Sequence, residues 1–194
     1  MLSRFPVKIY QFGPPLALLC IALIVFLFPD NWQLALRYDV DQLQAGQLWR
    51  VMTGHILHTN YWHLLLNCLG IILLWSLHGD YYDWRVFLLV TLGLILGCSV
   101  GLWFFSPEMT VYVGLSGALH GLFVWGSCSD IQHKLHSGWV LLLGIAVKIY
   151  YEQIDGASEH VSQLIDAEVA IDAHLYGAIV GLVMFALVRK KTPQ

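Results

Sequence analysis

Residues 111–126 read VYVGLSGALHGLFVWG and place one serine, Ser116, between glycines at the start of an apolar segment. A second apolar stretch near the C-terminus contains a lone histidine, His174. A strongly polar or ionisable side chain inside a membrane span is costly, and by default it marks a functional site. If both stretches lie within a membrane, Ser116 and His174 are therefore candidates for one shared reaction.

The composition indicates a membrane protein. Of the 194 residues, 58% are hydrophobic and 12% are charged, whereas soluble domains carry about 25% charged residues. The mean hydropathy of +0.65 likewise points to lipid as the main solvent. The net charge of -3 is small and says nothing about nucleic acid, but the sequence has no basic stripe that could bind phosphates, so no nucleic-acid partner is expected.

The cysteines and the N-terminal segment indicate which kind of membrane protein this is. All four cysteines lie in or beside apolar segments without C-x-x-C spacing, which predicts free, buried thiols rather than disulfides or a zinc site; they are Cys20, Cys68, Cys98 and Cys128. The first apolar run follows Arg4 and Lys8 like a signal peptide, but it reaches Trp32 without a small-x-small cleavage site. We therefore interpret it as an uncleaved first span.

Six apolar segments predict an all-α membrane protein, a six-helix transmembrane bundle that forms one domain over residues 1–194. The segments cover about 14–28, 61–77, 86–105, 116–128, 138–151 and 169–188. Pro14 and Pro15 fall at the start of the first, where proline is tolerated. The fourth and fifth segments are short for about 30 Å of hydrocarbon. They must extend through polar flanks or begin below the membrane surface, inside the protein.

Basic residues predict the orientation, because they concentrate in cytoplasmic loops. With the N-terminus inside, the inner segments hold seven: Arg4, Lys8, Arg85, Lys134, Arg189, Lys190 and Lys191. The outer loops hold two, Arg37 and Arg50, while Lys148 falls in the fifth span. The outer side instead collects acidic residues, among them Glu152. Both termini are thus predicted to be cytoplasmic, and the long connection over 30–60 is external, with tryptophans suited to the headgroup layer.

The second span begins with a cluster of polar residues. His63 and Asn67 are four residues apart and share one helix face, while His58 lies five residues earlier, at or before the helix start. Donors on a buried helix face could stabilise a developing oxyanion. They could equally hold neighbouring helices together. The spacing leaves both interpretations open.

Ser116 and His174 are linked by a pattern of small residues. A lone G-x-S-G also fits a helix-capping serine, although a helix N-terminus favours negative charge at that point. Small residues recur every four positions on the fourth and sixth spans, which predicts close helix contact; they are Gly117 and Gly121, then Ala173, Gly177 and Gly181. That contact would bring the His174 imidazole to the Ser116 hydroxyl, with His120 on the same face as Ser116.

Four motifs in this order resemble the rhomboid family of intramembrane serine proteases. They are Trp49-Arg50 in the first outer loop, His58-x4-His63-x3-Asn67, Gly114-x-Ser116-Gly117, and Ala173-His174-x2-Gly177-x3-Gly181. The resemblance covers nearly the whole chain. It implies that Ser116 is the nucleophile and His174 the general base, with no cofactor or metal. It further implies an oxyanion hole formed by His63, Asn67 and the Ser116 amide, with His58 in support.

One departure from the family pattern points to a branch. Rhomboids commonly carry tyrosine four residues after the nucleophile, where this chain has His120. The run Gly114-Leu-Ser-Gly-Ala-Leu-His-Gly121 is similar to the rhombosortase branch. That resemblance implies a bacterial inner-membrane protease. Its expected partners are membrane lipid and single-span proteins with a C-terminal tail: a Gly-Gly-type motif, a span and a basic cluster. The count of basic residues places the active-site end of the fourth span on the outer, periplasmic side.

Several alternatives remain open. The chain could be a general rhomboid protease with other single-span substrates, and the acyl-enzyme could pass to water or to an amine. His120 could orient His174 or merely fill space.

Asp172, two residues from His174, lies on another helix face and is interpreted as interfacial, so no third catalytic carboxylate is evident. A different class is a non-proteolytic metal or haem protein, using His58, His63, His120 and His174. An inactive relative would lack Ser116 or His174, and a transporter would show paired interrupted spans.

Overall fold

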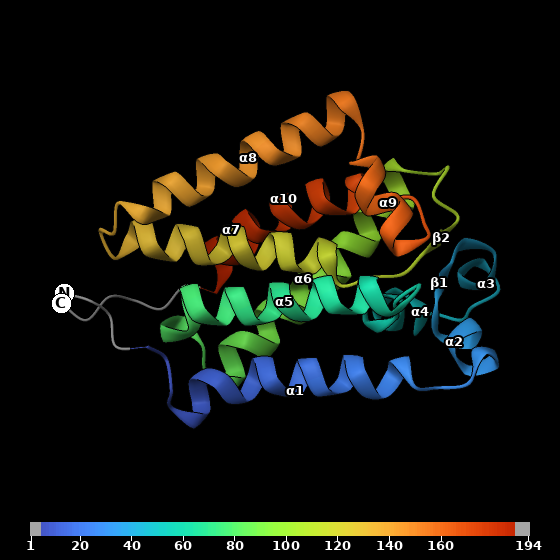
Figure 1. Ribbon diagram of the computed structural model, residues 1–194, viewed down its shortest axis with the longest axis horizontal. Helices are drawn as coiled ribbons and strands as arrows, with labels where there is room; N and C mark the ends of the chain where they lie inside the picture. Colours follow the sequence, from blue (N-terminus) through green and yellow to red (C-terminus); the bar gives the residue numbers. More distant parts are fainter. Residues whose placement is uncertain (1–4, 189–194) are drawn as a thin grey trace.

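The computed structural model describes residues 5–188 and consists of a bundle of long helices (Figure 1). Within these residues the six long helices are α1 (Ile9–Phe26), α5 (Tyr61–His78), α6 (Trp84–Phe105), α7 (Ser116–Gln132), α8 (Ser137–Asp155) and α10 (Ile171–Leu187). Three of the described helices, over Ile9–Phe26, Tyr61–Tyr81 and Trp84–Phe105, are long and apolar enough to cross a membrane by length and composition. The bundle agrees with the helical class predicted from the sequence.

The shorter elements gather mainly at one end of the bundle (Figure 1). The first long connection folds into α2 (Asp30–Leu36), α3 (Val40–Gln44), α4 (Arg50–Thr53) and the 3-10 helix η1 (Gly54–Ile56). Another 3-10 helix, η2 (Gly79–Tyr81), links α5 to α6, and α9 (Glu159–Ile165) precedes α10. Strands β1 (Tyr38–Asp39) and β2 (Val111–Tyr112) pair antiparallel, with Tyr38 opposite Tyr112. This small sheet was not predicted, because two-residue strands leave no alternation in a sequence.

Helix boundaries differ from the sequence prediction in two ways. Helix α1 begins at Ile9, so Pro14 and Pro15 lie in its second turn and not at its start. Helices α7 and α8 are 17 and 19 residues long because they continue through polar flanks, to Gln132 and Asp155 respectively. Both helices therefore extend through polar flanks, which is one of the two solutions predicted for the short fourth and fifth segments.

Close packing of α7 against α10 follows from the small-residue stripes, as predicted. A Cβ atom built on Gly177 would lie 1.9 Å from the carbonyl oxygen of Gly117, and one on Gly181 would lie 2.4 Å from that of Gly121. From the other side, a Cβ on Gly121 would lie 2.4 Å from the Gly177 oxygen. The two backbones touch along two helical turns, so the start of α7 is fixed relative to α10.

The core surrounds α6, with Val90 and Leu94 packed beside Trp125 of α7. Large apolar side chains cover much of the outer surface, including Val140 and Leu143 on α8, which suits contact with lipid. Three cysteines are free and buried as predicted, whereas Cys20 is exposed on α1, which corrects that expectation.

The charge pattern can be followed along the bundle. Lys8 precedes α1, Arg85 lies in the first turn of α6, and Lys134 lies between α7 and α8. The starts of α1, α6 and α8 lie at the end of the bundle opposite α2–α4 and α9 (Figure 1). The remaining residues of the predicted inner set, Arg4, Arg189, Lys190 and Lys191, lie outside the described residues.

Candidate active site

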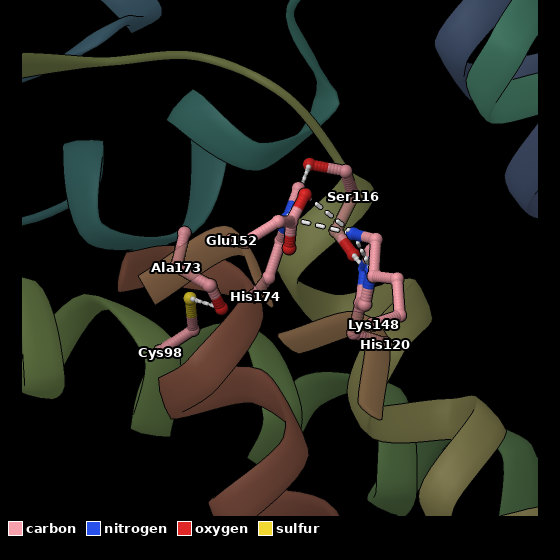
Figure 2. Close-up of polar contacts among 7 residues, drawn as sticks. All are labelled: Cys98, Ser116, His120, Lys148, Glu152, Ala173 and His174. Carbon is pink, nitrogen blue, oxygen red and sulfur yellow. Dashed lines mark hydrogen bonds and ion pairs between the residues drawn. The ribbon is translucent and has the colours of Figure 1, made fainter. Parts of the chain in front are cut away.

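Ser116 is the first residue of α7, and its hydroxyl faces α10 (Figure 2). It does not cap the helix, because Leu115 occupies the N-cap position and no side-chain cap is formed. Gly114 has φ +128°, a conformation that side chains rarely adopt, and a Cβ there would lie 2.7 Å from His63 Nε2. Glycine at this position thus lets the chain turn into α7 beside α5.

The Ser116 hydroxyl and the His174 imidazole are in hydrogen-bond contact. Their Oγ and Nε2 atoms are 3.0 Å apart, and His174 is only 4% exposed. Cys98 on α6 donates its S–H to the carbonyl oxygen of Ala173 at 3.4 Å, so the turn carrying His174 is held from a second side. The distance between Ser116 Oγ and His174 Nε2 is typical of a nucleophile and its general base.

His120 lies one turn into α7 and stacks on the same imidazole. The two rings are 3.9 Å apart at an interplanar angle of 15°, while His120 Nδ1 donates to the Ser116 carbonyl oxygen at 2.7 Å. His120 therefore contacts both members of the pair from the face predicted for it. The contact with His174 is a stacking contact.

The polar residues of α5 face the same space as Ser116. His63 and Asn67 are buried and line a cavity of about 240 Å³ together with Ser116, His120 and His174. Asn67 donates to the carbonyl oxygen of His63 at 3.1 Å, and Thr59 approaches His63 Nδ1 through its hydroxyl at 3.1 Å. A second cavity, of about 380 Å³, extends from Ser116 and His63 to the segments that precede α7 and α10, where it is lined by Thr110 and Glu168.

The other residues singled out from the sequence support the site from further away. His58 packs edge-to-face on His63 with ring centroids 5.1 Å apart, and burial lowers the pKa of His58 to about 3, so its ring is neutral. Arg50 is buried and donates to the carbonyl oxygens of Leu34 and Arg37, at 2.9 and 2.7 Å. Trp49 donates to the carbonyl of Ala35. Trp49 and Arg50 thus organise the connection between α1 and α5.

Asp172 is turned away from the site, as its helix position predicts. It accepts a hydrogen bond from the Ser106 hydroxyl at 2.5 Å, and Ser106 also contacts the Tyr176 hydroxyl at 2.8 Å. This group ties the end of α6 to α10.

Sequence reasoning missed two residues that lie at the centre of the site. Glu152 Oε2 is 3.0 Å from His174 Nδ1, and Lys148 Nζ is 2.7 Å from Glu152 Oε1 and 2.7 Å from His120 Nε2 (Figure 2). The signal was present, because two ionisable residues four apart at the end of an apolar helix are unusual. Glu152 was instead counted with the acidic residues of the outer side.

Among residues 5–188 one group of side chains could hold a metal ion, and it is not the four-histidine set considered from the sequence. It comprises His120, Glu152 and His174, whose ligand atoms lie within 4.8 Å of one another. His58 and His63 are not members of this cluster. The Lys148 ammonium lies beside all three side chains, including 3.2 Å from His174 Nδ1, and so already places a positive charge next to these atoms.

Comparison with known proteins identifies relatives of this chain. The sequence model of the Rhomboid domain matches residues 45–191. The protein named "Putative rhomboid protease YdcA" of Bacillus subtilis (strain 168) is 31% identical over 153 residues, which cover 75% of this chain and 70% of that protein. The match to the domain extends from before Arg50 to beyond Gly181 and so includes every residue of the site.

Proposed function

Because this chain belongs to the rhomboid family and is an intramembrane serine protease, we propose that Ser116 is its nucleophile and His174 its general base. One observation carries the proposal: Ser116 Oγ and His174 Nε2 are 3.0 Å apart at the contact between α7 and α10. In this reaction Nε2 takes the hydroxyl proton as Oγ attacks the scissile carbonyl, and later returns it to the leaving amine.

The oxyanion of the tetrahedral intermediate would be stabilised by His63, Asn67 and the Ser116 amide. A backbone N–H in the first turn of a helix has no acceptor within that helix and remains available for a ligand. Two facts support the side-chain donors: both are buried, and both line the Ser116 cavity. Preorganised donors in a site that excludes bulk water stabilise developing negative charge strongly.

We propose six spans in a bacterial inner membrane, with both termini in the cytoplasm and Ser116 open to the periplasmic side. The excess of basic residues in the predicted inner segments supports this orientation. So does the cavity that joins Ser116 to the outer loops through Thr110 and Glu168, because water must reach the acyl-enzyme.

The proposed substrate is a single-span protein that ends in a Gly-Gly-type motif, a membrane segment and a basic cluster. The support is the run GLSGALHG over 114–121, which is similar to the rhombosortase branch. A scissile segment must leave its helix to expose a carbonyl, and glycines lower that cost because they are poor helix formers. A basic cluster after the span would hold the substrate C-terminus inside, which presents the glycines to the outer side.

The test is cleavage of a purified tailed substrate by the enzyme in liposomes, with Ser116→Ala as the matched inactive control. Wild type should cut beside the glycines, and changing both glycines to leucines should block cleavage. Equal cleavage of the leucine variant, or of an unrelated single-span protein, would replace the tail substrate with a general rhomboid specificity. Cleavage that survives in Ser116→Ala would refute the proposed nucleophile.

A further inference from the structure

A charged pair on α8 reaches into the site from the side opposite Ser116. Lys148 and Glu152 are one helical turn apart, and both side chains point toward His174 and His120 (Figure 2). The Glu152 side chain is 14% exposed and that of His174 is 5% exposed. The pair lines an opening of about 400 Å³ on this side of His174, together with Asp155.

The hydrogen bonds around His174 assign its protons. Its Nε2 faces the Ser116 hydroxyl and must be free to accept that proton, so the ring hydrogen lies on Nδ1. The group next to Nδ1 is the Glu152 carboxylate, with its two oxygens at 3.0 and 3.2 Å. An acceptor at this position holds the imidazole in the tautomer that a general base requires.

Lys148 makes the complementary contacts. His120 donates from Nδ1 to the Ser116 carbonyl, so its Nε2 is an acceptor and receives a hydrogen bond from the Lys148 ammonium at 2.7 Å. The ammonium also donates to Glu152 at 2.7 Å. The ammonium also lies 3.2 Å from His174 Nδ1. Both groups carry hydrogens there, so they do not form a hydrogen bond, and the positive charge of Lys148 opposes protonation of the His174 ring.

We propose that Glu152 is a positioning residue of this protease, acting through His174, and that Lys148 balances its charge. This inference rests on the proposed Ser116–His174 chemistry. As the Oγ–carbon bond forms, the Ser116 proton moves to Nε2 and the ring becomes an imidazolium. The Nδ1 proton stays on the ring and is held by the carboxylate, which stabilises that cation. When the carbon–nitrogen bond breaks, the Nε2 proton goes to the leaving amine.

A simple helix-stabilising pair would predict something different. An ion pair four residues apart on a helix surface contributes little, and removing either charge would change stability slightly in the same direction. A positioning pair changes the reaction itself. Because Glu152 favours the imidazolium and Lys148 opposes it, their removal should move the acidic limb of the pH profile in opposite directions.

The test compares pH profiles of kcat/KM in liposomes for Glu152→Gln, Glu152→Asp and Lys148→Met. We expect Glu152→Gln to lose about 100-fold or more in kcat near neutral pH and to shift its acidic limb to lower pH. Lys148→Met should shift the limb to higher pH. Glu152→Asp keeps the charge and should recover at least about 10-fold over the glutamine variant. The titratable groups that face His174 and could also contribute are His120 on α7, His63 on α5, and Lys148 and Glu152 on α8.

The control is Asp155→Asn, which removes the same charge from the same opening three residues further along. Its profile should match wild type. The inference is overturned if Glu152→Gln keeps the wild-type limb, or if the glutamine and aspartate variants are impaired equally. Labelling of Ser116 by a serine-directed fluorophosphonate distinguishes a failure of the Glu152 inference from a failure of the proposed Ser116 chemistry. If the wild type is labelled and Glu152→Gln keeps wild-type activity, only the positioning role of Glu152 is refuted. An unlabelled wild type refutes the Ser116 chemistry itself. Thermal unfolding of each variant identifies any that fails to fold. If a Glu152 variant does not fold, the inference is decided by whether Lys148→Met shifts the acidic limb of the pH profile to higher pH.

Discussion

Adding one methyl group at Gly177 should disable the enzyme by separating its two reacting side chains. The Cβ of Gly177→Ala would begin 1.9 Å from the Gly117 carbonyl oxygen, and real Cβ atoms essentially never approach closer than 3.0 Å. Because the obstacle is backbone, α10 and α7 must move apart by at least the difference, 1.1 Å. Gly117 follows Ser116 directly, so a displacement of this size would open the 3.0 Å contact between Ser116 and His174 beyond hydrogen-bond range.

A misplacement of about 1 Å can lower a rate about 100-fold, and we expect a loss of that size for Gly177→Ala. The assay is cleavage of a single-span fluorescent substrate in liposomes, with thermal unfolding measured alongside. Gly144→Ala on α8 is the matched control, because a Cβ there meets nothing within 4 Å. The reasoning is refuted if folded Gly177→Ala cleaves at a rate close to that of Gly144→Ala.

Other substitutions separate the roles of the remaining groups. Ser116→Ala and His174→Ala should each abolish cleavage, and the double variant should be no slower than either, since the pair acts as a unit; additive losses would contradict this. Asn67→Ala should retain measurable turnover at about 100- to 1000-fold below wild type, the usual effect of one oxyanion donor, and a wild-type rate would remove Asn67 from that role. In Lys148→Ala the departing ammonium leaves two imidazoles and a carboxylate within 4.8 Å of one another, so micromolar Zn²⁺ should inhibit this variant and EDTA should restore it. Equal zinc sensitivity in wild type would show that the charge of the ammonium does not oppose metal binding there.

Much of the helix arrangement could be predicted because it depends on local patterns. Small residues every four positions on two helices favour close contact between their backbones, and Gly117 and Gly177 meet as that pattern indicates. The contact between Ser116 and His174 follows from it directly. His63 and Asn67 of α5 share one face as predicted, since a four-residue spacing fixes a helix face whatever packs against it.

What could not be predicted depends on which surfaces meet in space. Glu152 sits near the end of α8, where an acidic residue fits the membrane surface equally well, and only packing shows that it turns toward His174. The Tyr38–Tyr112 pairing joins segments far apart in the chain and involves too few residues to leave a pattern. The start of α1 was misplaced because Pro14 and Pro15 were assigned to a helix start, whereas the helix begins at Ile9.

Covalent labelling tests the central claim most directly. The enzyme in detergent is treated with a serine-directed fluorophosphonate, digested and analysed by peptide mass spectrometry, for wild type, Ser116→Ala and His174→Ala. We expect wild type to carry one phosphonyl group on Ser116, Ser116→Ala to carry none, and His174→Ala to label far more slowly because the hydroxyl lacks its base. Labelling at any other serine in the Ser116→Ala protein, or an unchanged labelling rate in His174→Ala, would contradict the assignment of Ser116 and His174 as the reacting pair.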